Sequence, residues 1–169
     1  RSGKAVHKAL VEEGVDAVLL DVGGDVKSVV REQGVEIAFI ALHGRFGEDG
    51  TVQRILEDMR IPYTGSGSEA SRCALDKIAA KDVFRKAGIP VPGHVVFKKS
   101  GFDVSEAAPL GLPVVVKPSL EGSSIGLSVV RERGALYDAV LKALEYDAKV
   151  LIEEYIDGRE LTVGVLADE

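Results

Sequence analysis

The N-terminal part of the chain alternates short apolar runs with segments whose apolar residues have helical spacing. The runs at 16–22 (DAVLLDV) and 36–42 (EIAFIAL) have the length and composition of buried β-strands. The segments 4–13, 25–33 and 51–60 have the periodicity and flanking residues of helices. Strands that alternate with helices are typical of parallel pairing. We therefore predict an α/β fold that begins with a three-layer αβα domain built on a parallel sheet.

The pattern changes after residue 65. Ser66 and Glu69 stand in capping-box register for a helix that ends near Leu75, and a second helix is predicted over 77–87. Beyond it, one helix is expected among five strands, which indicates an α+β unit with a mainly antiparallel sheet. The predicted strands are 94–99, 112–117, 127–132, 149–156 and 160–167, and the helix is 135–146. We expect the first domain to cover 1–72 and the second 73–169.

Composition narrows the class of function. The 169 residues carry 21 Lys and Arg against 27 Asp and Glu, a formal net charge of −6, with no basic block to attract nucleic acid. The apolar runs have strand length, so no membrane span is expected. A single cysteine, Cys73, predicts a cytoplasmic protein without an internal disulfide. The sequence has no Cys/His metal spacing, no G-x-S-x-G elbow and no G-x-G-x-x-G fingerprint, so zinc, serine-hydrolase and dinucleotide chemistry are disfavoured.

Lys117 and the loop after it are the most informative candidates. The lysine follows Val114, Val115 and Val116, so its ammonium would lie in apolar surroundings unless an anion pairs with it. The loop 119–126 then supplies glycines and serine hydroxyls that can converge on a polyanion such as a triphosphate. A flexible connection between two strands is the alternative interpretation.

Each of the other candidate site residues also has a simpler interpretation that gives it no functional role. Lys77 could be a solvated surface residue, and His43 an ordinary loop residue after a buried strand. Glu153 and Glu154 are adjacent in an apolar strand, which indicates either a wet sheet edge or acceptors for a ligand amino group. Glu160 follows a turn. It could line the same ligand site, an apolar slot, or it could cap the turn.

Four ordered segments together resemble the D-alanine-D-alanine ligases of the ATP-grasp superfamily. They are ALHGRFGEDGTVQ (41–53), IPYTGSGSEASRCALDK (61–77), LPVVVKPSLEGSSIGLSVV (112–130) and VLIEEYIDGRELTVGVL (150–166). The resemblance implies a substrate-binding domain followed by the central ATP-grasp subdomain. It also implies a Mg²⁺- and ATP-dependent ligase, a homodimer, that joins two D-alanines for peptidoglycan through a D-alanyl phosphate.

The resemblance further implies a role for each candidate residue. Lys77 and Lys117 match the lysines that neutralise the ATP phosphates, and Ser123 and His43 match residues beside the D-alanine substrate. The remaining matches are Glu121, Gly122 and Ser124 in the flap over the phosphates, Glu153 and the backbone near Ile156 at adenine, and Glu160 at the ribose. No residue of this chain matches a metal ligand.

Two departures from the family pattern shape the expectation for activity. Family members usually begin with a glycine-rich strand that carries a glutamate, and end with a domain that carries the Mg²⁺ ligands; neither is recognisable here. We therefore expect the chain by itself to be inactive. Two alternatives to the leading function are a D-alanine-D-lactate ligase and a nucleotide-binding module without turnover.

Overall fold

The structure is a computed structural model that describes residues 2–165. The chain divides into two compact units. The first contains the residues up to Pro90 together with the segment Ser119–Ile125, and the second contains Val91–Pro118 and the residues from Gly126 onward. The segment Ser119–Ile125 therefore belongs to the first unit, although the strands on either side of it belong to the second.

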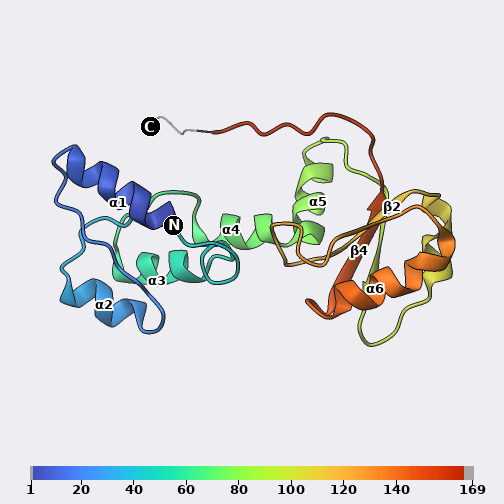
Figure 1. The fold of residues 1–169 in the computed structure, drawn as a ribbon, viewed down its shortest axis with the longest axis horizontal. Helices are drawn as coiled ribbons and strands as arrows, with labels where there is room; N and C mark the ends of the chain where they lie inside the picture. Colours follow the sequence, from blue (N-terminus) through green and yellow to red (C-terminus); the bar gives the residue numbers. More distant parts are fainter. Residues whose placement is uncertain (1, 166–169) are drawn as a thin grey trace. The chain divides into compact units, whose positions relative to one another are not determined.

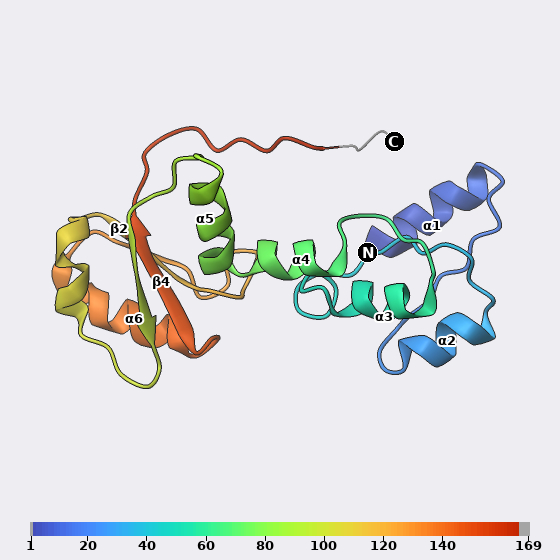
Figure 2. The ribbon, with the colours of Figure 1, turned by 180° about the vertical axis from the view of Figure 1, so that it is seen from behind.

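The first unit is helical in its regular structure, and its predicted helices are confirmed (Figure 1). Its small core is formed by α2 and α3, where Val26, Val30, Val52 and Leu56 are buried. Helix α4 contacts α3 near its own start, at Ser68, and leads into α5 (Figure 2). The bounds are α1 (Ser2–Glu12), α2 (Val26–Glu32), α3 (Thr51–Met59), α4 (Ser68–Leu75) and α5 (Lys77–Lys86).

The segments 16–22 and 36–42 do not form regular strands, contrary to the sequence prediction. One parallel bridge joins Ala38 to Tyr63, where Ala38 N–H donates to Pro62 O at 2.9 Å. The side chains of Ile37 and Phe39 are 68% and 54% exposed. A strand needs a hydrogen-bonded neighbour along its length, and within residues 2–165 the segment 36–42 has only this bridge. Parallel pairing is present, but not as a continuous ladder.

The start of α4 also differs from the predicted capping box. Gly67, in an extended conformation, is the N-cap and has no side-chain cap, so Ser66 lies outside the helix. Glu57 of α3 instead accepts hydrogen bonds at the N-terminus of α4, from Ser68 N–H at 2.9 Å and from Ser68 Oγ at 2.6 Å. A side chain distant in the sequence therefore satisfies a backbone donor in the first turn of α4, in place of the predicted Ser66 cap.

The second unit is built on a four-stranded antiparallel sheet of order β1-β4-β2-β3. Helix α6 (Leu136–Leu144) lies along one face of the sheet, where its Val140 and Ala143 pack with Val116 and Ile152 in the larger core (Figure 1). The strands are β1 (His94–Lys98), β2 (Val114–Pro118), β3 (Ser128–Val130) and β4 (Lys149–Glu154), and two 3₁₀ helices are η1 (Val104–Leu110) and η2 (Arg133–Ala135).

The predicted fifth strand of this unit, 160–167, is absent from its described part. Residues 160–165 have no regular structure, and Leu161, Val163 and Val165 are 78%, 83% and 86% exposed. Strand β4 is already paired on both sides, by β1 and β2, so the segment that follows cannot pair beside it. Residues 166 and 167 lie outside the described residues. No helix between residues 2 and 165 is long and apolar enough to cross a membrane.

Candidate functional site

Lys117 and Glu153 form an ion pair on the sheet of the second unit. Strands β2 and β4 pair with Val115 opposite Glu153 and Lys117 opposite Leu151, so the two charged side chains are diagonal neighbours on one face. Lys117 Nζ contacts Glu153 Oε1, and the two side chains are 21% and 9% exposed. The sequence predicted that an anion must meet this ammonium, and Glu153 is that anion in the structure.

The position of β4 excludes one of the two interpretations of the paired glutamates. Because β4 is an inner strand, Glu153 does not lie on a wet sheet edge. Glu154 is exposed, and its Oε2 accepts a hydrogen bond from Gly93 N–H at 2.8 Å. A Cβ at Gly93 would lie 3.0 Å from the Glu154 carboxyl carbon, so glycine permits this contact. Glu153 therefore faces Lys117, whereas Glu154 ties the start of β1 to β4.

The last two candidates of the second unit follow β4. Ile156 is 65% exposed, one residue after Tyr155, whose N–H donates to Pro113 O at 3.2 Å. Glu160 is exposed, in a segment without regular structure. The sheet brings Lys117 and Glu153 together, and it does not bring Ile156 and Glu160 to them.

Lys77 in the first unit holds the backbone of the segment 119–125. Its Nζ donates to Ser119 O at 3.2 Å and to Glu121 O. The neighbouring Asp76 is the N-cap of α5, and it accepts from Ile78 N–H and from Ser119 Oγ, each at 3.0 Å. Lys77 is therefore a partly buried residue with defined acceptors, which does not fit the alternative of a solvated surface lysine.

The tip of that segment is a strained turn. Ser123 and Ser124 have φ angles of 50° and 59°, and Ile125 N–H donates to Gly122 O at 3.0 Å. Left-handed backbone is unfavourable for residues with a Cβ, by about 1 kcal/mol each. Both serines are exposed, while the stem residue Ser119 is fully buried. Strain concentrated at an exposed tip is typical of ligand-binding loops.

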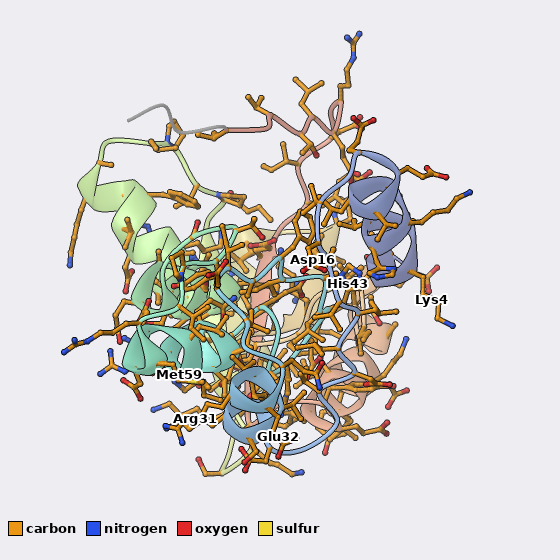
Figure 3. All side chains as sticks on the ribbon, turned by 90° about the vertical axis from the view of Figure 1, so that its left-hand side faces the viewer. Lys4, Asp16, Arg31, Glu32, His43 and Met59 are labelled. Atoms are coloured by element: carbon orange, nitrogen blue, oxygen red, sulfur yellow. The ribbon has the colours of Figure 1, made fainter. Side chains whose placement is uncertain are left out.

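His43 lies in the loop that follows the segment 36–42, beside the start of α1 (Figure 3). Its Nε2 is 3.4 Å from Ser2 Oγ, and its Nδ1 is 3.8 Å from Glu48 Oε1. Glu48 in turn accepts a hydrogen bond from Gly44 N–H at 2.8 Å through Oε2. The histidine is thus held beside a carboxylate that its own loop supplies.

A cavity of about 530 Å³ borders His43 in the first unit, and its wall includes Glu48, Gln53, Ser66 and Ser71. Gln53 is buried, and its Nε2 donates to Gly47 O at 2.8 Å, while its Oε1 has no hydrogen-bond partner among residues 2–165. A buried acceptor in a cavity wall can receive a donor from a small polar molecule. Between residues 2 and 165, no group of three or more His, Cys, Asp and Glu is arranged to hold a metal ion.

Comparison with known families decides the assignment of the chain. The family model described as the D-ala D-ala ligase C-terminus matches residues 83–169, and the one described as the D-ala D-ala ligase N-terminus matches residues 2–66. The chain belongs to the D-alanine-D-alanine ligase family. The resemblance carried by the four sequence segments is confirmed.

Individual ligases match almost all of this chain. A D-alanine-D-alanine ligase of Citrifermentans bemidjiense is 53% identical over 165 residues, which cover 98% of this chain and 53% of the relative. The crystal structure of the Bacillus anthracis ligase has a TM-score of 0.82 at 32% identity, and covers 92% of this chain and 53% of that one. The same enzyme complexed with ATP has a TM-score of 0.80 at 29% identity, with 93% and 55% covered. The chain spans about half the length of the curated relatives it matches.

The ligase fold also presents residues that sequence reasoning missed. Arg45 forms an ion pair with Glu121, Glu48 lies beside His43, and Gln53 lines the cavity. All three belong to the run HGRFGEDGTVQ, in which only the histidine and the glycines stand out by residue type. A run that alternates charged residues with glycines directly after an apolar segment was the available signal.

Proposed function

We propose that the protein acts as an ATP-dependent ligase that joins two D-alanines into D-alanyl-D-alanine, for peptidoglycan synthesis. Membership of the ligase family supports the reaction. The observation in the structure that carries the proposal is the ion pair between Lys117 and Glu153, which places a lysine and a carboxylate on one face of the ATP-grasp sheet.

The chemistry needs cations at the phosphates. The carboxylate of the first D-alanine attacks the γ-phosphoryl group, ADP leaves, and a D-alanyl phosphate forms. Because an anion attacks an anion, fixed positive charge lowers the barrier. We assign this role to Lys117 and Lys77. Lys77 now donates to the carbonyl oxygens of Ser119 and Glu121, and phosphate oxygens are stronger acceptors for an ammonium than neutral carbonyls are.

The remaining candidates have supporting roles in the proposal. Glu153 and the backbone near Ile156 bind adenine, Glu160 binds the ribose, and Glu121, Gly122 and Ser124 cover the phosphates. Ser123 and His43 contact the D-alanine substrate; the cavity beside His43, with its polar wall, has room for a small zwitterion. The amine of the second D-alanine attacks the carbonyl carbon of the D-alanyl phosphate, and inorganic phosphate leaves.

Three further properties stay predictions: dependence on Mg²⁺ and a homodimer, which the resemblance implies, and a cytoplasmic location, which the single cysteine indicates. The described residues do not form a Mg²⁺ site, so we derive no catalytic step from that ion for this chain.

The proposal is tested by measuring ADP release from the complete gene product. We expect release that depends on D-alanine and Mg²⁺, with one D-alanyl-D-alanine formed per ADP. D-lactate, offered with D-alanine across a range of pH, distinguishes a D-alanine-D-lactate ligase. Tight ATP binding without ADP release under any of these conditions would contradict the proposal and favour a nucleotide-binding module.

A further inference from the structure

Two loops of the first unit are joined by an ion pair that has no assigned role. We name residues 43–50 the histidine loop and residues 119–125 the serine-glycine loop. Arg45 Nη2 lies 2.6 Å from Glu121 Oε1, and Arg45 Nε donates to the same oxygen at 2.9 Å. Two donors of one guanidinium thus converge on a single carboxylate oxygen, which fixes the relative orientation of the two side chains.

Glu121 is well shielded from water, unlike the members of most surface ion pairs in this chain. Its side chain is 16% exposed, whereas the Arg45 side chain is 58% exposed. The other arginine pairs of the first unit, such as Arg85 with Asp82, join residues one helical turn apart, and both of their side chains are exposed. Local exposed pairs contribute little to stability. The pair between Arg45 and Glu121 instead joins segments that are distant in the sequence.

The serine-glycine loop is fixed at its stem and strained at its tip. Lys77 binds the carbonyl oxygens of Ser119 and Glu121, and Asp76 accepts from the Ser119 hydroxyl. A Cβ placed on Gly122 would lie 3.9 Å from Glu48 Oε2, so the tip begins beside the carboxylate that contacts His43. The serine-glycine loop therefore lies close to the histidine loop at Glu48 as well as at Arg45.

We propose that Arg45 is a positioning residue that, through Glu121, couples the serine-glycine loop to the histidine loop. The proposal rests on the proposed function, in which Glu121, Gly122 and Ser124 cover the phosphates and His43 contacts D-alanine. If the two loops move together, D-alanine at one loop changes the affinity for nucleotide at the other, and the reverse holds by the same factor. Arg45 touches neither substrate in this scheme and acts through Glu121.

The first test is amide hydrogen exchange of residues 119–125 in the complete gene product without ligand. We expect Arg45→Met to raise the exchange rate of these amides about 10-fold, which corresponds to ~1.4 kcal/mol of local opening free energy. Glu121→Gln also raises the exchange rate, and the double variant has a smaller effect than the sum of the two single effects, because both substitutions remove the same ion pair. Arg85→Met is the matched control, and its exchange in this loop equals that of the unmodified protein.

The second test measures coupling between ligands. The dissociation constant of a non-hydrolysable ATP analogue is measured with and without saturating D-alanine. D-alanine tightens analogue binding in the unmodified protein and in Arg85→Met, and this effect is lost in Arg45→Met. The exchanged pair Arg45→Glu with Glu121→Arg restores at least part of it, because the ion pair can form in the reversed sense.

The outcomes separate the inference from the proposed function. The inference would be overturned if Arg45→Met left amide exchange in residues 119–125 unchanged, or if D-alanine still tightened analogue binding fully in this variant. Neither result would count against the proposed ligase function. Absence of analogue binding in the unmodified protein would instead count against the proposed function, whatever the exchange of the loop shows.

Discussion

At the scale of single residues, the sequence pattern predicts that a buried charge needs a partner, but it does not identify the partner. Three valines before Lys117 correctly indicate that its ammonium needs an anion. They cannot identify Glu153 as that anion, because the pairing of β2 with β4 depends on strand order, which local periodicity does not encode. A bound ligand is therefore not the only anion that compensates this charge. Loss of Lys117 must affect folding as well as nucleotide binding.

Lys117→Met is therefore expected to lower the free energy of unfolding by about 3 kcal/mol, because it removes the cation that pairs with the buried Glu153 carboxylate. The double variant Lys117→Met with Glu153→Leu recovers most of this loss, since a buried ion pair can be replaced by apolar side chains. Neither variant binds ATP with the parent affinity. Urea unfolding and calorimetry measure the two effects separately.

Lys149→Met is a suitable control, because Lys149 is an exposed residue of the same β4 strand. This substitution should change neither the free energy of unfolding nor the affinity for ATP appreciably. Parent-like ATP affinity in the double variant would show that Lys117 does not serve the nucleotide.

Glu57 gives a prediction about pH. Hydrogen bonds from the Ser68 hydroxyl and backbone, and then from Tyr63, lower the pKa of Glu57 from 4.5 to about 2. A carboxylate whose pKa is depressed by folding contributes stability above its unfolded pKa and loses that contribution as pH falls toward the folded value. The stabilisation should be full above about pH 4.5 and lost between pH 4.5 and 2.

We expect Glu57→Gln to destabilise the protein at pH 6 and to flatten the acid dependence of the unfolding free energy in that window. The same substitution at exposed Glu13 is the control. The unfolding free energy of Glu57→Gln and of the parent could show the same dependence on pH. That result would contradict a stabilising role of the ionised Glu57 carboxylate between α3 and α4.

At the scale of elements, helices were predictable and the strands of the first unit were not. A helix satisfies its backbone hydrogen bonds locally, so periodicity and end signals locate α1, α2, α3 and α5 within a few residues. A strand satisfies them through a neighbour. The segments 16–22, 36–42 and 160–165 have strand-like composition, but the described residues provide no continuous partner for them.

The junction of α3 with α4 provides a prediction at this scale. Gly50, the N-cap of α3, has φ 88°, and a Cβ there would lie 2.3 Å from Ser68 O of α4. Gly50→Ala should therefore lower the unfolding free energy through two effects. Left-handed strain costs about 1 kcal/mol, and the backbone clash costs a further ~1–3 kcal/mol.

Gly14→Ala isolates the first effect. Gly14 has φ 78°, and among residues 2–165 no heavy atom beyond Gly14 and its chain neighbours lies within 4 Å of the position that a Cβ would take there, so only the strain is expected. Chemical denaturation compares the two variants. Equal losses for Gly14→Ala and Gly50→Ala would contradict close packing between the starts of α3 and α4.

At the scale of the whole molecule, the order of the sequence motifs indicated the family better than any single motif did. No single feature distinguishes a serine-glycine loop that binds phosphate from a hairpin connection, whereas four segments in a fixed order indicated the family that the comparisons then showed. The pairing of Arg45 with Glu121, and the membership of residues 119–125 in the first unit, required the structure. Contacts between segments distant in the sequence leave no local periodicity to detect.

The central claim is that the carboxylate of D-alanine is activated as an acyl phosphate. The most direct measurement supplies the complete gene product with ATP and D-alanine whose carboxyl oxygens are ¹⁸O, and analyses the released phosphate by mass spectrometry. We predict one ¹⁸O in each phosphate, because the attacking oxygen stays on phosphorus when the amine displaces it from the carbonyl carbon. Dipeptide formation with unlabelled phosphate, or no phosphate release at all, would contradict the account.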